Sequence, residues 1–333
     1  MKLKIFFISF AVSIPLWLGV NVLNGRLENF LFLEKIAADP KTMAAALNQQ
    51  ALGQQIEDAG FLKRPNPQAL EINAKAGLSI LIDENGKKEI LFSKNPEEKL
   101  AIASLTKLMS AYIVVNYFDL SGDLEIAQGV LLKRGTTENL KPGEIFKIKD
   151  ILYSSLVESD NDGISALSQL TSQNGFVVLM NLEAGYLGLN DTKFFNSTGL
   201  DPENSEEPAN FSTARDVALL SSEVFKNPLI SQILSSREFD LYDSQNVFNH
   251  KSVTTNELLA SSDFKNMRIV AGKTGETPRA GGCLVLVLEN PSRKQTLVNV
   301  ILGSDNRFGE MKKLTDWAIN SLNYRNYLNT LLY

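Results

Sequence analysis

Cysteine and histidine each occur once in the 333 residues, at Cys283 and His250, and this scarcity excludes several kinds of site. One cysteine cannot form a disulfide within the chain, and the pair supplies too few ligands for a typical zinc site. The scarcity of cysteine and histidine does not exclude a metal site built from carboxylates alone, but no sequence feature predicts a metal or a cofactor. A Ser-His-Asp triad would have to use His250, and the Gly-x-Ser-x-Gly turn of many such hydrolases is absent. If the chain performs acyl transfer, we expect a base other than histidine.

An excess of positive charge is also missing, because 33 Lys and Arg residues stand against 38 Asp and Glu residues, for a net charge of −5. Nucleic acid is therefore not an expected partner. The content of 44% hydrophobic and 21% charged residues is typical of a folded globular protein.

One long apolar run is present, at the start of the chain. Ile5 to Leu23 contains nineteen residues without a charge, enough for a helix of roughly 28 Å, and Lys2 and Lys4 precede it. The run is longer than the apolar part of most signal peptides and lacks an Ala-x-Ala-like cleavage site, so residues 1–25 predict an uncleaved membrane anchor, with a cleaved signal peptide as the alternative. The two lysines favour a cytoplasmic N-terminus and place the rest of the chain outside the cell membrane.

The remaining chain divides into a spacer at 26–67, which is rich in Ala and Gln and ends in a Pro-rich stretch, and a catalytic domain at 68–333. Apolar spacing in this domain predicts two strands joined by an Asn-Gly turn, two helical stretches, three more strands and a last helix. Since an isolated hairpin is marginally stable, we expect an α+β fold in which both chain ends build one five-stranded antiparallel sheet, flanked by helices and a mainly helical subdomain. The expected elements are strands at 76–82 and 89–93, helices at 101–118 and 149–170, strands at 267–277, 282–288 and 296–302, and a helix at 310–322.

Three short motifs carry the candidate chemistry. Ser104 and Lys107 form a Ser-x-x-Lys pair near a helix start, so the amine and the hydroxyl lie on one face about a turn apart. The pattern is weak alone, because it recurs at Ser262. Ser-x-Asn occurs four times, and we choose Ser159, since it follows an apolar run and breaks the helical pattern. Lys-Thr-Gly occurs once, at Lys273, within an apolar strand whose glycines leave room for a ligand backbone along its edge.

In this order, the three motifs resemble the signature of penicillin-binding proteins and class A β-lactamases. From about Ala76 to Trp317 the chain is similar to the low-molecular-weight D-alanyl-D-alanine carboxypeptidases, peptidase family S11. The likeness extends to the segments at 100–103, 156–158, 194–201, 212–216 and 271–283. It implies a β-lactamase/transpeptidase-like fold and an enzyme that removes the terminal D-Ala from peptidoglycan stem peptides. β-Lactam antibiotics would be its covalent inhibitors.

The resemblance also implies catalytic roles. Ser104 would be the acylated nucleophile, Lys107 its base, and Ser159 a relay that passes a proton to the leaving amine. A free lysine titrates near about 10.4, so the pKa of Lys107 must fall by about three through burial and a like charge, for which Lys273 is the obvious source.

The implied substrate contacts lie on the other two motifs and near the last helix. Asn161 would clamp the substrate backbone, and Thr274 with Lys273 behind it would receive the substrate carboxylate beside Gly275. The backbone N–H groups of Ser104 and Glu276 occupy the positions of an oxyanion hole. Arg307 resembles an additional arginine for the terminal carboxylate.

Some features depart from the carboxypeptidase pattern. Asp160 makes the second motif Ser-Asp-Asn, which is more familiar in class A β-lactamases, and Glu276 adds a carboxylate that could weaken binding of an anionic substrate. A β-lactamase would need a deacylating glutamate, for which Glu207 is the candidate, but its spacing to the following asparagine is wrong. A catalytically silent protein that binds peptidoglycan is a further alternative. We expect His250 to support a loop or face solvent, and Cys283 to be a buried small side chain.

Overall fold

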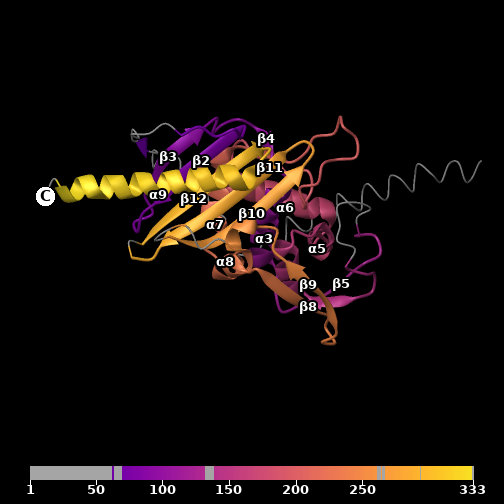
Figure 1. The fold of residues 1–333 in the computed structure, drawn as a ribbon. Coiled ribbons are helices and arrows are strands. Elements are labelled where there is room, and N and C mark those ends of the chain that lie inside the picture. The colour runs from indigo at the N-terminus through magenta and orange to yellow at the C-terminus, as the bar shows by residue number, and fades with distance from the viewer. Residues whose placement is uncertain are drawn as a thin grey trace, which may run out of the picture. The chain divides into compact units, whose positions relative to one another are not determined.

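Strands from both ends of the chain meet in one sheet in the computed structural model of the protein (Figure 1). The structure describes residues 62–63, 70–131, 139–260, 264, 267–292 and 294–331. The chain divides into two compact units, Met1–Leu52 and Gly53–Tyr333, and all of the described residues belong to the second unit. The predicted anchor at 1–25 and most of the predicted spacer at 26–67 lie outside the described residues.

The large sheet contains five antiparallel strands, as predicted. Their spatial order is β3 (Lys88–Lys94), β2 (Ala76–Ile82), β12 (Gln295–Ser304), β11 (Gly281–Asn290) and β10 (Arg268–Thr277). A two-residue strand, β1 (Leu62–Lys63), pairs in parallel with β3, so two residues of the predicted spacer join the sheet edge. At the opposite edge, β10 has β11 as its neighbour on one side, which leaves its other side available to the site.

The turn between β2 and β3 has the expected Asn-Gly chemistry. Gly86 adopts a φ of +78°, and the Asp83 side chain accepts hydrogen bonds from the backbone N–H groups of Asn85 and Lys87 at 2.9 and 3.0 Å. A glycine is favoured at such a φ because it has no Cβ. This local turn therefore sets the register of the hairpin.

Helices cover both faces of the sheet. On one face, Leu284 and Leu286 of β11 belong to the same buried cluster as Met311 and Leu314 of α9 (Arg307–Leu331), which crosses the strands in Figure 1. Successive side chains of a strand point to opposite faces, so Cys283 points away from α9, and its sulfur contacts the Ala101 carbonyl at 3.8 Å. The segment that contains Ser104 therefore lies on the face opposite α9.

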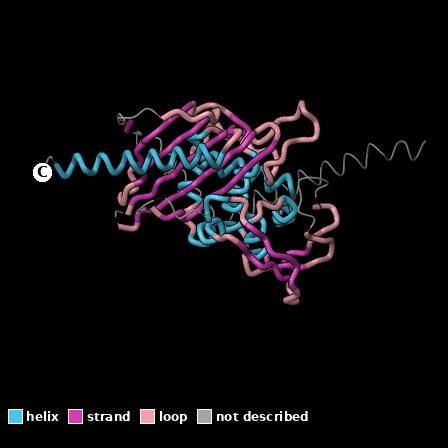
Figure 2. Tube along the Cα trace, viewed as in Figure 1, coloured by secondary structure: helices cyan, strands magenta, loops and turns pink. Residues whose placement is uncertain are grey.

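The middle of the chain supplies the helical part and three short strand pairs. The helices are α3 (Thr106–Tyr117), α4 (Ile148–Val157), α5 (Asn161–Leu167), α6 (Gln173–Tyr186), α7 (Ala214–Val224) and α8 (Pro228–Ser235), with the 3-10 helices η1 (Ala103–Leu105), η2 (Ser168–Leu170) and η3 (Glu257–Ala260). The pairs are β4 (Leu100–Ala101) with β7 (Phe211–Ser212), β5 (Asp123–Glu125) with β6 (Ile145–Lys147), and β8 (Glu238–Tyr242) with β9 (Phe248–Val253). Figure 2 shows the β8–β9 hairpin as a pair of magenta strands separate from the large sheet.

Both predicted helical stretches of the middle are divided at residues with positive φ. Residues 101–118 begin as a strand and turn at Ala103, whose φ is +47°, before α3 starts. Residues 149–170 break at Ser159, whose φ is +62°, as the polar cluster there predicted. A non-glycine residue is uncommon in this region and is held there by its surroundings. Both breaks lie beside candidate catalytic residues.

Among the described helices, none combines the length and the apolar character that a membrane span requires.

Candidate active site

A short strand and a strained turn position the candidate nucleophile, Ser104. β4 pairs with β7, and the chain then turns at Ala103, so that Ser104 lies in η1 directly before α3. Gly199 packs against this turn, since a Cβ added there would lie 1.9 Å from the Ala103 carbonyl oxygen. Because two heavy atoms cannot approach so closely, only glycine is compatible with this packing.

The Lys107 amine lies inside the protein and faces Ser104. The Lys107 side chain is fully buried, and its Nζ lies 3.0 Å from Ser104 Oγ, 2.6 Å from Asn161 Oδ1 and 2.9 Å from the Thr198 carbonyl oxygen. Two of these partners are carbonyl-type oxygens, which only accept hydrogen bonds. These two oxygens each accept one N–H group of the Lys107 amine. The remaining position on Nζ faces the Ser104 hydroxyl, which can donate a hydrogen bond as well as accept one.

This arrangement suits a neutral amine. Burial lowers the pKa of Lys107 to about 7, while the Asp160 charge acts in the opposite direction. The depression predicted for a base is therefore present, and burial, one of its two predicted causes, is the main one, whereas the Lys273 charge is not among the causes. A neutral Lys107 keeps two N–H groups for Asn161 and Thr198 and turns its lone pair toward the proton of Ser104.

The second motif sits between two helices. Asp160 caps α5 by accepting a hydrogen bond from the Gly163 N–H at 2.7 Å, which places Asn161 at the first helical position. The residue before the cap, Ser159, accepts a hydrogen bond from Lys273 Nζ at 2.7 Å. One short segment thus reaches Lys107 through Asn161 and Lys273 through Ser159.

The third motif lies on the edge strand β10. Lys273 is buried, and its Nζ also donates to the Thr274 carbonyl at 3.0 Å. Burial, and then the charges of Lys107 and Arg307, hold the pKa of Lys273 well below its usual value. The hydroxyl of Thr274 is hydrogen-bonded to that of Thr255, which follows β9.

Gly275 packs closely against the segment that carries the nucleophile. A Cβ at this position would lie 3.0 Å from the Ser104 nitrogen and 3.1 Å from the Ile102 oxygen, so the glycine lets β10 approach the nucleophile segment itself. As a result, the backbones that carry Ser104 and Glu276 adjoin, as the two donors of an oxyanion hole require.

Glu276 and Arg307 form an ion pair at the end of β10. Arg307 Nη1 donates to the Glu276 carboxylate and lies 3.5 Å from the Gly275 carbonyl oxygen. The arginine side chain is 18% exposed and the glutamate side chain 67% exposed, so the arginine is fixed against the strand and the glutamate covers it. Arg307 Nε is buried and has no hydrogen-bond partner within the described part of the chain.

The other matches to the motifs serve local structure. Ser172 caps α6 by accepting from the Gly175 N–H, Asn246 lies in the β8–β9 turn with a φ of +64°, and Ser304 accepts from the Asn306 N–H before α9. These three matches are therefore ordinary caps and turns. The second Ser-x-x-Lys pair, at Ser262, lies outside the described residues. Within the described residues, no three His, Cys, Asp or Glu side chains form a group that could hold a metal ion.

Residues 63–306 match the peptidase S11 family, described as D-alanyl-D-alanine carboxypeptidase. The chain belongs to this family. The resemblance inferred from the three motifs is thereby confirmed, and the family makes the chain a serine peptidase. Among curated S11 relatives, a D-alanyl-D-alanine endopeptidase of Pseudomonas aeruginosa is 31% identical over 76% of this chain and 81% of its own length. D-alanyl-D-alanine carboxypeptidase DacC of Escherichia coli is 32% identical over 78% of this chain and 64% of its own length.

Solved structures are similar in fold. The Streptomyces K15 DD-transpeptidase has a TM-score of 0.66 at 22% identity, covering 76% of this chain and 99% of its own. Penicillin-binding protein D2 of Listeria monocytogenes, in its ampicillin-bound form, has a TM-score of 0.64 at 26% identity, covering 75% and 99%. The predicted transpeptidase-like fold is therefore confirmed.

One contribution to this S11 site was not predicted by the three motifs. The Thr198 carbonyl holds the Lys107 amine, and Asn196 shapes that loop by accepting from the N–H groups of Thr198 and Gly199 at 3.1 and 2.7 Å. A carbonyl acceptor leaves no side-chain signal, but an Asn three residues before a Gly indicates such a turn. His250, which we expected to support a loop or face solvent, is largely buried beside Glu158.

We predict that Ser104 acylation follows the neutral fraction of Lys107. With a pKa of about 7, the amine is protonated at lower pH and has a free lone pair at higher pH. The neutral fraction rises from about one tenth at pH 6 to about nine tenths at pH 8. The second-order rate of labelling by a fluorescent penicillin should therefore rise several-fold across this interval, with a midpoint near pH 7. Lys107→Arg, which cannot become neutral, should abolish the rise, and a wild-type rate that stays level from pH 6 to 8 would contradict the assignment.

Proposed function

We propose that this chain is a serine D-Ala-D-Ala peptidase that cleaves peptidoglycan stem peptides through an acyl-enzyme on Ser104. The observation that carries the proposal is the buried Lys107 amine, with two N–H groups held by acceptors and its remaining position facing the Ser104 hydroxyl. An alcohol is a weak nucleophile until an adjacent base takes its proton. Lys107 meets that need without a histidine.

Each step of the reaction has a residue in place. Lys107 takes the proton as Ser104 Oγ forms a bond to the carbonyl carbon before the terminal D-Ala. The developing oxyanion is held by the backbone N–H groups of Ser104 and Glu276, where losing one donor typically costs about 3 kcal/mol. Ser159, hydrogen-bonded to Lys273, passes a proton to the leaving amine as the C–N bond breaks. Water then hydrolyses the ester: its oxygen bonds to the acyl carbon as the bond to Ser104 Oγ breaks, Lys107 returns its proton to Ser104, and the proton released by water restores the Ser159–Lys273 pair.

Polar groups around this centre would orient the substrate. Asn161 clamps the peptide backbone, while Thr274 and the Lys273 side chain behind it receive the terminal carboxylate. Arg307 adds positive charge at the same end of β10. β-Lactams would enter as analogues of the D-Ala-D-Ala unit and acylate the same serine.

The geometry disfavours the β-lactamase alternative. Glu207 is exposed, and its carbonyl accepts a hydrogen bond from Arg279. Asn210 is buried and bridges the Thr106 hydroxyl and the backbone of Phe195. Neither residue offers Ser104 a carboxylate that could activate water for rapid deacylation.

The silent peptidoglycan-binding alternative is also disfavoured. A protein that only binds peptidoglycan would not require a lowered pKa at Lys107. Such a function would also leave the strained turn at Ala103 unexplained. Strain of this kind costs about 1 to 3 kcal/mol and is typical of active sites.

We propose further that residues 1–25 anchor the enzyme in the cell membrane, with the peptidase domain on the extracytoplasmic side. The support is the uncharged run of nineteen residues behind two lysines, together with a substrate that lies outside the membrane. Release after cleavage of a signal peptide is the alternative.

The first test of the function is release of D-Ala from a peptide that ends in D-Ala-D-Ala. We expect Ser104→Ala to lower the rate on the order of a thousandfold or more, because the nucleophile is removed. Ser222→Ala on α7, whose hydroxyl bonds its own helix at 2.7 Å, is the matched control and should keep wild-type activity. Equal release from wild type and Ser104→Ala would refute the assignment of the nucleophile.

A second prediction concerns Glu276, whose charge opposes that of a substrate carboxylate beside Arg307. Glu276→Gln should lower KM for a substrate with a free C-terminal carboxylate by about twofold to fivefold, the range expected for an exposed ion pair. The KM for a C-terminally amidated substrate should not change. Glu289→Gln, which breaks an exposed pair with Arg268 at the other end of the same two strands, is the control. An equal change for both substrates would show that Glu276 does not act on the carboxylate.

A third prediction tests the anchor. The full chain should sediment with membranes and remain there after a high-salt wash, whereas a chain that lacks residues 1–25 should not. If cells that express the full chain instead yield the peptidase domain in the soluble fraction, with its N-terminus shortened, the cleaved signal peptide would be supported.

A further inference from the structure

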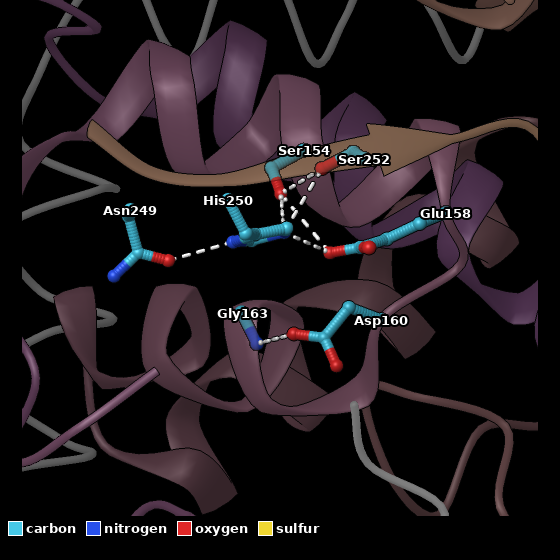
Figure 3. Close-up of polar contacts among 7 residues, drawn as sticks. All are labelled: Ser154, Glu158, Asp160, Gly163, Asn249, His250 and Ser252. Carbon is cyan, nitrogen blue, oxygen red and sulfur yellow. Dashed lines mark hydrogen bonds and ion pairs between the residues drawn. The ribbon is translucent and has the colours of Figure 1, made fainter. Parts of the chain in front are cut away.

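The single histidine of the chain holds the β8–β9 hairpin against the end of α4. Its side chain is 14% exposed, and Nε2 lies 2.8 Å from the Glu158 carboxylate, whose side chain is 11% exposed. Nδ1 lies 2.6 Å from Asn249 Oδ1. Figure 3 shows the imidazole of His250 between Glu158 and Asn249, with Ser154 and Ser252 beside Nε2. Both the histidine and the glutamate are thus part of one largely buried polar cluster.

Both ring nitrogens of His250 lie against oxygen atoms. Asn249 Nδ2 donates to the Glu144 carboxylate at 3.2 Å, so the Asn249 oxygen is the atom that faces Nδ1. On the other side, Nε2 lies 2.8 Å from the Glu158 carboxylate. This contact spans 92 positions of the sequence and joins β9 to the end of α4.

Glu158 connects this cluster to the active site. It is the C-terminal cap of α4, and its backbone N–H donates to the Ser154 carbonyl at 3.1 Å. The next residue is Ser159, which is held in the left-handed region and hydrogen-bonded to Lys273. The Ser154 hydroxyl also lies 2.7 Å from that of Ser252 and 3.2 Å from the Glu158 carboxylate. The last turn of α4 is therefore fixed from the side of the hairpin immediately before Ser159.

We propose that His250 and Glu158 are positioning residues that hold Ser159 at the correct place to deliver a proton to the leaving amine. This rests on the peptidase function proposed above. Neither side chain touches the substrate, and their effect passes through one peptide bond to Ser159. The hairpin also fixes the other partner of the relay, because Thr255 follows β9 and bonds Thr274 beside Lys273.

The role predicts an unusual dependence on the leaving group. An amide nitrogen is a poor leaving group and must receive a proton as its bond to carbon breaks. A thiolate leaves without one. Loss of the clamp should therefore slow hydrolysis of a peptide that ends in D-Ala-D-Ala more than hydrolysis of the thioester with the same acyl part, whereas general damage to the fold would slow both.

Two substitutions at His250 separate its two nitrogens. His250→Gln places an amide nitrogen near the position of Nε2 and can still donate to Glu158, whereas His250→Asn places it near Nδ1 and cannot. We expect His250→Asn to lower kcat on the amide about tenfold to a hundredfold, because misplacing a group by about 1 Å costs on the order of a hundredfold, with less than about a threefold change on the thioester. His250→Gln should stay within about threefold of wild type on both.

The control on the same strand is Lys251→Met, which breaks exposed ion pairs with Glu238 and Asp240 on the opposite face of β9 and should change neither rate. Circular dichroism and thermal unfolding check that each variant is folded. Glu158→Gln, which keeps size and loses charge, provides a milder variant that should lower the same amide-to-thioester ratio. Equal losses on both substrates, or equal losses in His250→Asn and His250→Gln, would overturn the proposal. A wild-type protein inactive on both substrates would instead overturn the proposed function.

Discussion

The site depends on the burial of one amine. Moving an ammonium ion out of water costs several kcal/mol in a folded protein, so a lysine enclosed as fully as Lys107 stabilises its neutral form. The enclosure comes from three separate segments, which supply the Ser104 hydroxyl, the Asn161 amide and the Thr198 carbonyl. Because no single helix or strand could exclude water from the amine, the reactivity of the nucleophile is a property of the assembled fold.

Two strained residues bring those segments together. Ala103 and Ser159 both have positive φ without being glycine, and each stands beside a hydroxyl of the site or carries one. The strain at Ala103 is supported by Gly199, whose hydrogen atoms leave space for the Ala103 carbonyl. The strain at Ser159 is supported by the Asp160 cap on one side and by Glu158 with its histidine partner on the other. Both supports are local, whereas the sheet sets the distance between the two turns.

Much of this architecture follows from sequence patterns, and the remainder does not for identifiable reasons. The order of the three motifs excludes only Ser304, and the apolar run and the break in the helical pattern at Ser159 select it from the other three Ser-x-Asn matches. Alternation and turn residues located the five main strands. The Thr198 carbonyl escaped because backbone acceptors have no residue signature. The pairing of Glu276 with Arg307 joins residues 31 positions apart, and its geometry depends on how α9 leaves β12. The contact of His250 with Glu158 spans 92 positions and requires a hairpin that apolar spacing did not predict.

The two buried lysines also explain how proton uptake at one amine favours proton release at the other during the proposed reaction. Each amine faces a serine hydroxyl, at 3.0 Å for Lys107 with Ser104 and 2.7 Å for Lys273 with Ser159. The charge of Lys107 lowers the pKa of Lys273, so protonation of the first amine makes the second a stronger acid. Under the proposed mechanism, the proton that leaves Ser104 raises the tendency of Lys273 to release its own through Ser159. Attack and leaving-group protonation are thus coupled electrostatically, and the segment from Ser159 to Asn161 contacts both amines at once.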